Sequence, residues 1–153
     1  LAFILAMLMP VVMLAIYVSQ IEETGVLGLV GFSLMLIGMA AYLGFHFDMA
    51  FVWPVLAERA PELIDFSGPM FRHPRFAFIH FWMGPIHSIG TLLFGIALIK
   101  ARIFPRKVSI MFIIGIVLSA GVLFPPFLLR AIGGVIGSFA LTWIASFLWN
   151  RTR

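Results

Sequence analysis

Five long stretches of the chain contain no aspartate, glutamate, lysine or arginine, and this pattern constrains the fold more than any other feature. They cover residues 1–20, 24–47, 76–99, 108–129 and 131–150. A helix rises about 1.5 Å per residue, so about 20 apolar residues cross the ~30 Å hydrocarbon layer of a bilayer. Each stretch is therefore long enough to span a membrane, and most of the chain is predicted to lie in lipid.

The composition favours one membrane domain built of helices. Hydrophobic residues make up 63% of the chain and charged residues 10%, whereas a soluble domain carries about 25% charged residues. Backbone groups find no water inside a bilayer, and these runs lack the alternation of barrel strands, so each span is expected to be a helix. We predict an all-α polytopic transmembrane helical bundle with five spans, a single domain over residues 1–153, with spans at about 1–20, 25–47, 76–99, 108–124 and 128–150.

Basic residues between the third and fourth spans set the predicted orientation. Four lysines and arginines lie within residues 100–107, and these residue types accumulate in cytoplasmic loops. With this segment inside, the C-terminus is cytoplasmic, the N-terminus lies outside, and the long connection at residues 46–75 is an outer loop. The net charge of +4 then reflects span ends that meet lipid headgroups. The expected partner is the lipid bilayer, not nucleic acid.

Small residues four positions apart on the predicted spans indicate where helices approach closely. In lipid, helix association depends on such side chains, because they let two backbones come into contact. The pairs serve either packing within this bundle or an interface with another membrane subunit or a second copy of the chain. They are Ala40 and Gly44, Gly84 and Ser88, and Gly133 and Gly137.

Histidines are candidate functional groups, because ionisable side chains inside a membrane are costly and tend to mark sites. His80 and His87 lie seven residues apart, on one face of a predicted helix with a Gly-Pro pair between them. Imidazoles on facing helices can hold haem, and one imidazole can ligate the magnesium of a chlorophyll. His46, His80 and His87 are therefore candidate ligands for haem or a chlorophyll-type pigment. Alternatively, neutral histidines bond to one another, to Asp48 or to loop carbonyls.

A metal site at the outer interface is a further alternative. Asp48 and His73, together with His46 and His80, offer oxygen and nitrogen ligands that suit zinc, and a zinc-bound water supports hydrolysis. However, the sequence contains no HExxH motif and no GxSxG nucleophile motif. The absence of cysteine also excludes disulfides and thiolate chemistry.

Three segments of the chain resemble a group of small bacterial multi-span membrane proteins without an assigned activity. They are residues 17–31 (YVSQIEETGVLGLVG), 54–65 (PVLAERAPELID) and 94–105 (FGIALIKARIFP). The resemblance covers about a quarter of the chain. It implies a helical bundle in a bacterial cytoplasmic membrane, and it supplies no catalytic residues.

These observations together favour a non-catalytic integral membrane protein, an accessory or scaffolding subunit that packs against partner helices or binds an apolar ligand. The reason is the lack of a coherent catalytic set, combined with several small-residue helix faces. A haem- or pigment-binding electron-transfer subunit is the alternative. A metal-dependent membrane hydrolase is the third hypothesis.

Overall fold

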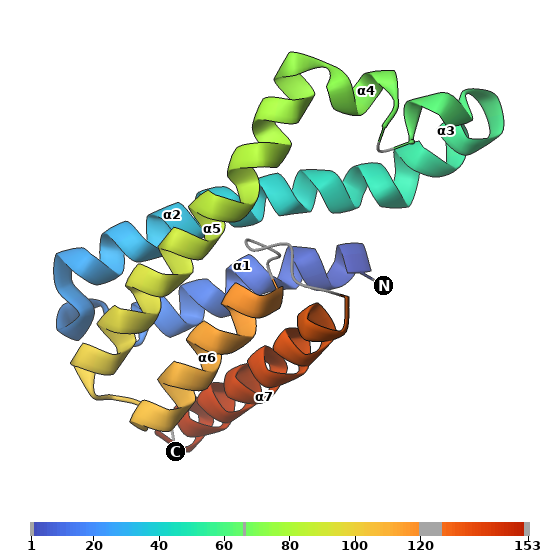
Figure 1. Ribbon diagram of the computed structural model, residues 1–153. Helices are drawn as coiled ribbons and strands as arrows, with labels where there is room; N and C mark the ends of the chain where they lie inside the picture. The colour runs from blue at the N-terminus through green and yellow to red at the C-terminus, as the bar shows by residue number, and fades with distance from the viewer. Residues whose placement is uncertain (1, 66, 120–126, 152–153) are drawn as a thin grey trace.

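The computed structural model describes residues 2–65, 67–119 and 127–151, and the regular structure in these ranges is helical (Figure 1). The prediction of an all-α chain is therefore confirmed. The longer helices are α1 (Ala2–Val18), α2 (Ile21–Phe47), α5 (Pro74–Ala101), α6 (Arg106–Ser119) and α7 (Phe127–Arg151). The connection between α2 and α5 contains a π-helical turn (Asp48–Val52), α3 (Trp53–Arg59), a 3-10 turn (Pro61–Leu63) and α4 (Pro69–Arg72).

In the described residues, three helices are long and apolar enough to cross a membrane: Ile21–Arg59, Pro74–Ala101 and Leu128–Asn150. The first of these combines α2, the π-helical turn and α3, so the second predicted span continues as a helix into the expected outer loop. Helix α1 has 17 residues and α6 has 14 described residues. The expected end of the fourth span, at residue 124, lies outside the described residues. Three of the five predicted spans therefore correspond to described helices that are long and apolar enough to cross a membrane.

The five longer helices pack against one another in pairs. Helix α2 packs along α1 and crosses α5, and α6 packs against α5 and α7. In Figure 1, α3 and α4 lie at one end of the molecule, whereas the connection from α5 to α6 lies at the other. The basic residues of 100–107 are therefore at the end opposite the charged residues of α3 and α4.

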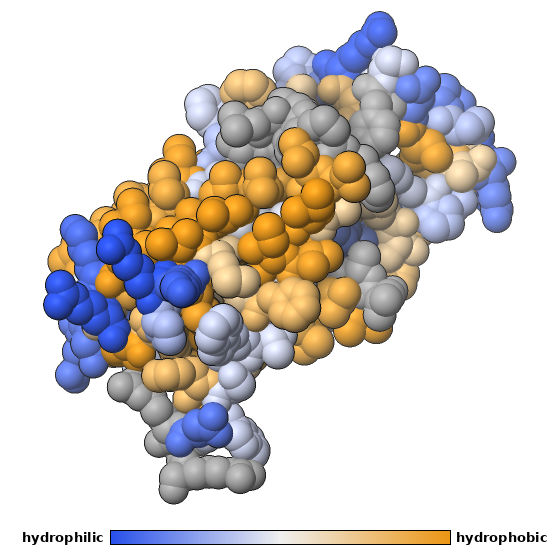
Figure 2. Space-filling model, turned by 60° about the horizontal axis from the view of Figure 1, so that its bottom comes forward, coloured by the Kyte–Doolittle hydropathy of each residue, from blue (hydrophilic) through white to orange (hydrophobic). Residues whose placement is uncertain are grey.

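The surface of the bundle is apolar between these two ends. Figure 2 shows a broad hydrophobic face with hydrophilic groups gathered at opposite sides. Large apolar side chains are exposed on the described part of the molecule, and examples are Val26, Leu128 and Phe139, which are 77%, 68% and 66% exposed. Monomeric soluble proteins rarely expose an apolar surface of this extent. The face is compatible with contact to lipid.

Aromatic side chains fill the centre of the bundle. The rings of Tyr17 and Phe32 stack with their centroids 4.5 Å apart, which joins α1 to α2. Phe94 of α5 lies 6.0 Å from Phe32 and 6.3 Å from Phe112 of α6. Ile144 of α7 is also fully buried. One core therefore holds the five longer helices together.

Glycines allow the helices to cross with their backbones in contact. A Cβ atom on Gly31 would overlap the backbone of Phe94, and one on Gly90 would overlap the backbone of Met35. These glycines bring α2 and α5 together. A similar crossing joins α6 to α7.

The predicted packing residues occupy different surroundings. Gly133 and Gly137 face Gly115 of α6 within the same chain. Ala40 is exposed, and a Cβ on Gly44 would meet no atom within 4 Å. Gly84 is half-buried and Ser88 is buried.

Candidate ligand-binding cavity

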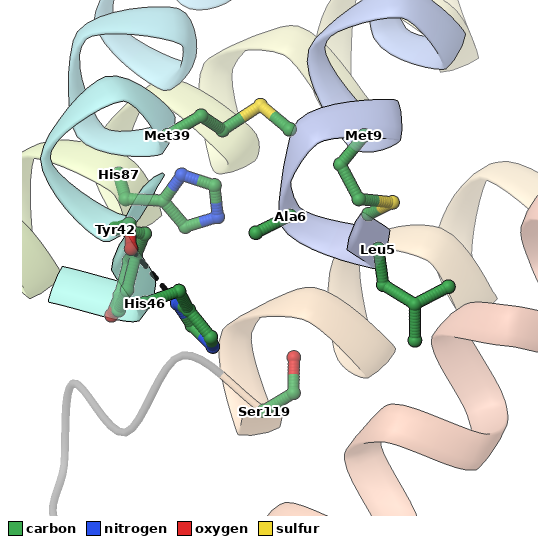
Figure 3. A pocket seen from close by; sticks show the side chains of 8 residues that line it. All are labelled: Leu5, Ala6, Met9, Met39, Tyr42, His46, His87 and Ser119. Atoms are coloured by element: carbon green, nitrogen blue, oxygen red, sulfur yellow. Dashed lines mark hydrogen bonds between the residues drawn. The ribbon is translucent and has the colours of Figure 1, made fainter. Parts of the chain in front are cut away.

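A cavity of about 360 Å³ lies between α1, α2, α5 and α6 (Figure 3). Ligand sites are typically concave and mostly apolar, with a few polar groups, and occupy about 300–1,000 Å³. This cavity has that character and lies at the small end of the range. Its described lining consists of Leu5, Ala6, Met9, Met39, Tyr42, His46, His87 and Ser119.

Helix periodicity accounts for the α2 side of the cavity. Met39, Tyr42 and His46 follow one another at steps of three and four residues, so they lie on one face of the helix. His87 comes from α5, where Gly38 of α2 leaves room for it. A Cβ on Gly38 would overlap the His87 side chain and backbone. The close α2–α5 crossing therefore places His87 at the cavity wall.

His87 is held in a defined orientation. Its side chain is 8% exposed, its Nδ1 atom lies 3.3 Å from the carbonyl oxygen of Met35, and its ring meets the ring of Tyr42 edge-on at 5.3 Å. A carbonyl oxygen can only accept a hydrogen bond, so Nδ1 carries the hydrogen. The Nε2 atom of the neutral ring is then an acceptor. In Figure 3 this side of the ring points into the cavity, towards Ala6.

His46 has the same tautomer for the same reason. Its Nδ1 atom donates to the carbonyl oxygen of Tyr42, 2.8 Å away and one turn earlier on α2. Its Nε2 atom points away from that carbonyl, towards the Ser119 side of the cavity (Figure 3). The hydroxyl of Ser119 donates to the carbonyl of Ile116 at 3.0 Å. Both imidazoles are therefore anchored by carbonyls of α2, and not by loop carbonyls.

The described lining carries no formal charge. It contains no aspartate, glutamate, lysine or arginine, so no carboxylate in it could pair with an imidazolium. Apart from the histidines, Tyr42 and Ser119, its side chains are aliphatic or thioether. The cavity therefore suits a neutral, largely apolar molecule with a small polar end.

Of the three predicted cofactor ligands, His46 and His87 lie at this cavity, whereas the side chain of His80 lies outside the description. Asp48 lines a separate groove of about 310 Å³ that also includes Gly44 and Phe76. His73 is exposed, directly before α5. Among the described side chains, no group of three or more histidines, aspartates or glutamates lies close enough to hold a metal ion.

Several cavity residues were not identified from the sequence. Met39 and Tyr42 lie seven and four residues before His46, so the helical period could have placed them on its face. Met9 and Ser119 belong to α1 and α6, and no sequence pattern connects these helices with His46. Their position depends on how the helices pack.

Comparisons of the chain with protein-family models, with curated proteins and with solved structures found no match. We therefore infer the function from the chemistry of the cavity itself.

Proposed function

We propose that this chain is a non-catalytic integral membrane protein that binds an apolar ligand in the cavity between α1, α2, α5 and α6. One observation carries the proposal: a cavity of about 360 Å³, uncharged in its described lining, holds two oriented imidazoles among mainly apolar side chains. Leu5 at its edge is 55% exposed, so a molecule dissolved in the surrounding lipid can reach the cavity without crossing water.

The proposal includes five spans in a bacterial cytoplasmic membrane, with the N-terminus outside. Helix α1 is about 26 Å long, close to the ~30 Å of the hydrocarbon layer, and it packs along α2. The basic residues of 100–107 support a cytoplasmic position for the connection from α5 to α6. Within this arrangement, α3 and α4 lie at the outer surface.

Cysteine labelling tests the orientation cleanly, because the chain has no cysteine of its own. Single-cysteine variants Glu58→Cys and Lys107→Cys are treated in intact cells with a membrane-impermeant maleimide. We expect Glu58→Cys to react at once and Lys107→Cys to react only after permeabilisation. Labelling of Lys107→Cys in intact cells would contradict the proposed orientation.

Ligand binding is tested by mass analysis of what co-purifies with the protein. The protein is extracted from its native membrane into polymer-bounded lipid discs without detergent, and its bound molecules are identified by native mass spectrometry. Ala6→Phe places a ring in the cavity, because Ala6 points into it (Figure 3). The matched control is Ala40→Phe, which adds the same ring at an exposed position of α2.

We expect a small molecule to accompany the wild-type protein and the Ala40→Phe variant, and to be lost from Ala6→Phe. Equal occupancy in the two variants would show that the cavity is not the binding site. An empty wild-type protein would also contradict the proposal.

A haem- or pigment-binding function remains the second candidate, and the imidazole geometry favours it. Metal-ligating histidines commonly donate one ring N–H to a carbonyl, which leaves the other nitrogen for the metal, and His46 and His87 both do so. The absorption spectrum of the same preparation separates the two functions. A Soret band that is lost in His87→Leu would identify a haem ligand.

A further inference from the structure

We propose that the cavity selects ligands whose polar end donates a hydrogen bond, namely lipid-soluble alcohols and phenols. Ligands ending in a ketone, ester or ether are then disfavoured. This inference rests on the proposed ligand-binding function and goes further, because it assigns the chemical class of the ligand. It follows from the direction of the hydrogen bonds around the cavity.

The two imidazoles present acceptors to the cavity. Each ring uses its single N–H on a backbone carbonyl, His87 on Met35 and His46 on Tyr42. In a neutral imidazole with its hydrogen on Nδ1, the Nε2 atom has a lone pair and no hydrogen. Within the described part of the chain, neither Nε2 atom forms a hydrogen bond of its own.

Ser119 adds a third acceptor. Its only hydroxyl hydrogen is directed to the carbonyl of Ile116, so the lone pairs of its oxygen remain for a ligand. The thioethers of Met9 and Met39 also only accept, and weakly. Three polar groups from three helices thus have the same hydrogen-bonding character.

Tyr42 also lines the cavity, and its phenolic hydroxyl can both donate and accept. It therefore does not by itself discriminate between ligand types. The discrimination is assigned to the histidines, and the experiment must separate their contribution from that of Tyr42.

A ligand oxygen that can only accept would face a lone pair on each imidazole. To donate from Nε2, a ring would have to move its hydrogen and lose its bond to the carbonyl. A ligand hydroxyl avoids this loss, and one net hydrogen bond is worth roughly tenfold in affinity. A cationic amine would also donate, but the described lining has no carboxylate to pair with it. A neutral hydroxyl fits best.

The test compares 4-nonylphenol with its methyl ether, 4-nonylanisole, in which a methyl group replaces the donor hydrogen. Both are added to the purified full chain in phosphatidylcholine nanodiscs, and bound probe is measured by native mass spectrometry. Empty nanodiscs give the partitioning of each probe, so that affinities are compared at equal concentration in the bilayer. Ala6→Phe and Ala40→Phe serve as the blocked and matched control proteins.

We expect the phenol to bind the wild-type protein about tenfold more tightly than the ether, and neither to bind Ala6→Phe. His46→Leu is expected to lose part of this preference, because the acceptor of His87 remains, while its helical circular-dichroism spectrum is unchanged; an unchanged preference in this variant contradicts the role of His46. In Tyr42→Phe, a phenol preference that persists supports the assignment to the imidazoles, and its loss overturns that assignment.

Failure of the inference and failure of the proposed function give different results. If both probes bind equally to the wild-type protein and neither binds Ala6→Phe, ligand binding stands and the donor preference is wrong. If the wild-type protein binds no more of either probe than Ala6→Phe does, both the function and the inference are wrong.

Discussion

Two adjacent glycines on α7 allow a sharp test of how this bundle is held together. Gly133 and Gly134 are consecutive in the sequence, but of the two only Gly133 faces α6. A Cβ built on Gly133 would lie 2.6 Å from the Cβ of Leu118, whereas one on Gly134 would meet no atom within 4 Å. We therefore predict that Gly133→Ala destabilises the protein and that Gly134→Ala does not.

The size of the effect follows from the contact distance. Carbon atoms pack at about 3.5–4.0 Å, so Gly133→Ala must push α6 and α7 apart by about 1 Å. A gap of that size forfeits roughly a quarter to a half of each van der Waals contact across it, and overpacking of this kind typically costs about 1–3 kcal/mol. Both substitutions gain up to about 1 kcal/mol in helix propensity, so this gain cancels in the comparison, and the Cβ on Gly134 adds no overlap. The two variants should differ by roughly 1–3 kcal/mol.

The assay is unfolding in mixed micelles by titration with sodium dodecyl sulfate, followed by circular dichroism. We expect the midpoint of Gly133→Ala to fall below that of the wild-type protein, and that of Gly134→Ala to stay equal or rise. Equal midpoints for the two variants would refute the argument that close backbone approach at Gly133 joins α6 to α7. Lower stability of Gly134→Ala alone would point instead to an interface on the other face of α7.

Three further predictions concern single positions. Arg102 caps the C-terminus of α5 with φ of 57°, a left-handed conformation that costs a non-glycine residue about 1–2 kcal/mol. Arg102→Gly should therefore raise the free energy of unfolding by about 1 kcal/mol, measured as a higher unfolding midpoint. Phe94→Ala should leave a cavity of ~100 Å³ in the core, and at ~24 cal/mol per Å³ this lowers the free energy of unfolding by about 2 kcal/mol. Phe139→Ala is the control and should change the free energy of unfolding little, because Phe139 is exposed. The backbone N–H and the hydroxyl of Ser67 both donate to Asp65 and lower the pKa of its carboxyl group. The turn is therefore stabilised at pH values above the unfolded pKa, and this stabilisation is lost as the pH falls through the lower folded pKa. Ser67→Ala should raise that pKa, measured by NMR titration.

The apolar helices are compatible with membrane insertion, and in lipid the interactions that hold helices together differ from those in water. Lipid tails are as apolar as leucine, so burying an apolar side chain between helices gains little transfer free energy in a membrane. Close packing and satisfied hydrogen bonds must supply the association. The glycine crossings of α2 with α5 and of α6 with α7 fit this requirement, and so do the serine and threonine hydroxyls that bond to carbonyls of the preceding turn.

The helical elements could be predicted closely from the sequence. The charge-free stretches end near residues 20, 47, 99 and 150, and the helices α1, α2, α5 and α7 end within two residues of these positions. The agreement has a local cause, because charged residues avoid hydrocarbon and backbone groups in lipid must bond within their own segment. The continuation of α2 through the π-helical turn into α3 extends beyond the charge-free stretch, and Pro54 stands in the first turn of α3.

The sequence by itself determined the helical class and the approximate ends of α1, α2, α5 and α7, because these properties depend on neighbours along the chain. Tertiary structure alone decided which histidines share a cavity. His46 and His87 are 41 positions apart in a chain with many apolar side chains of similar size, and only the crossing at Gly38 sets His87 beside Tyr42. Periodicity assigns a residue to a face of its own helix, but it does not state which helix that face will meet. That choice depends on the fit of small and large side chains between helices.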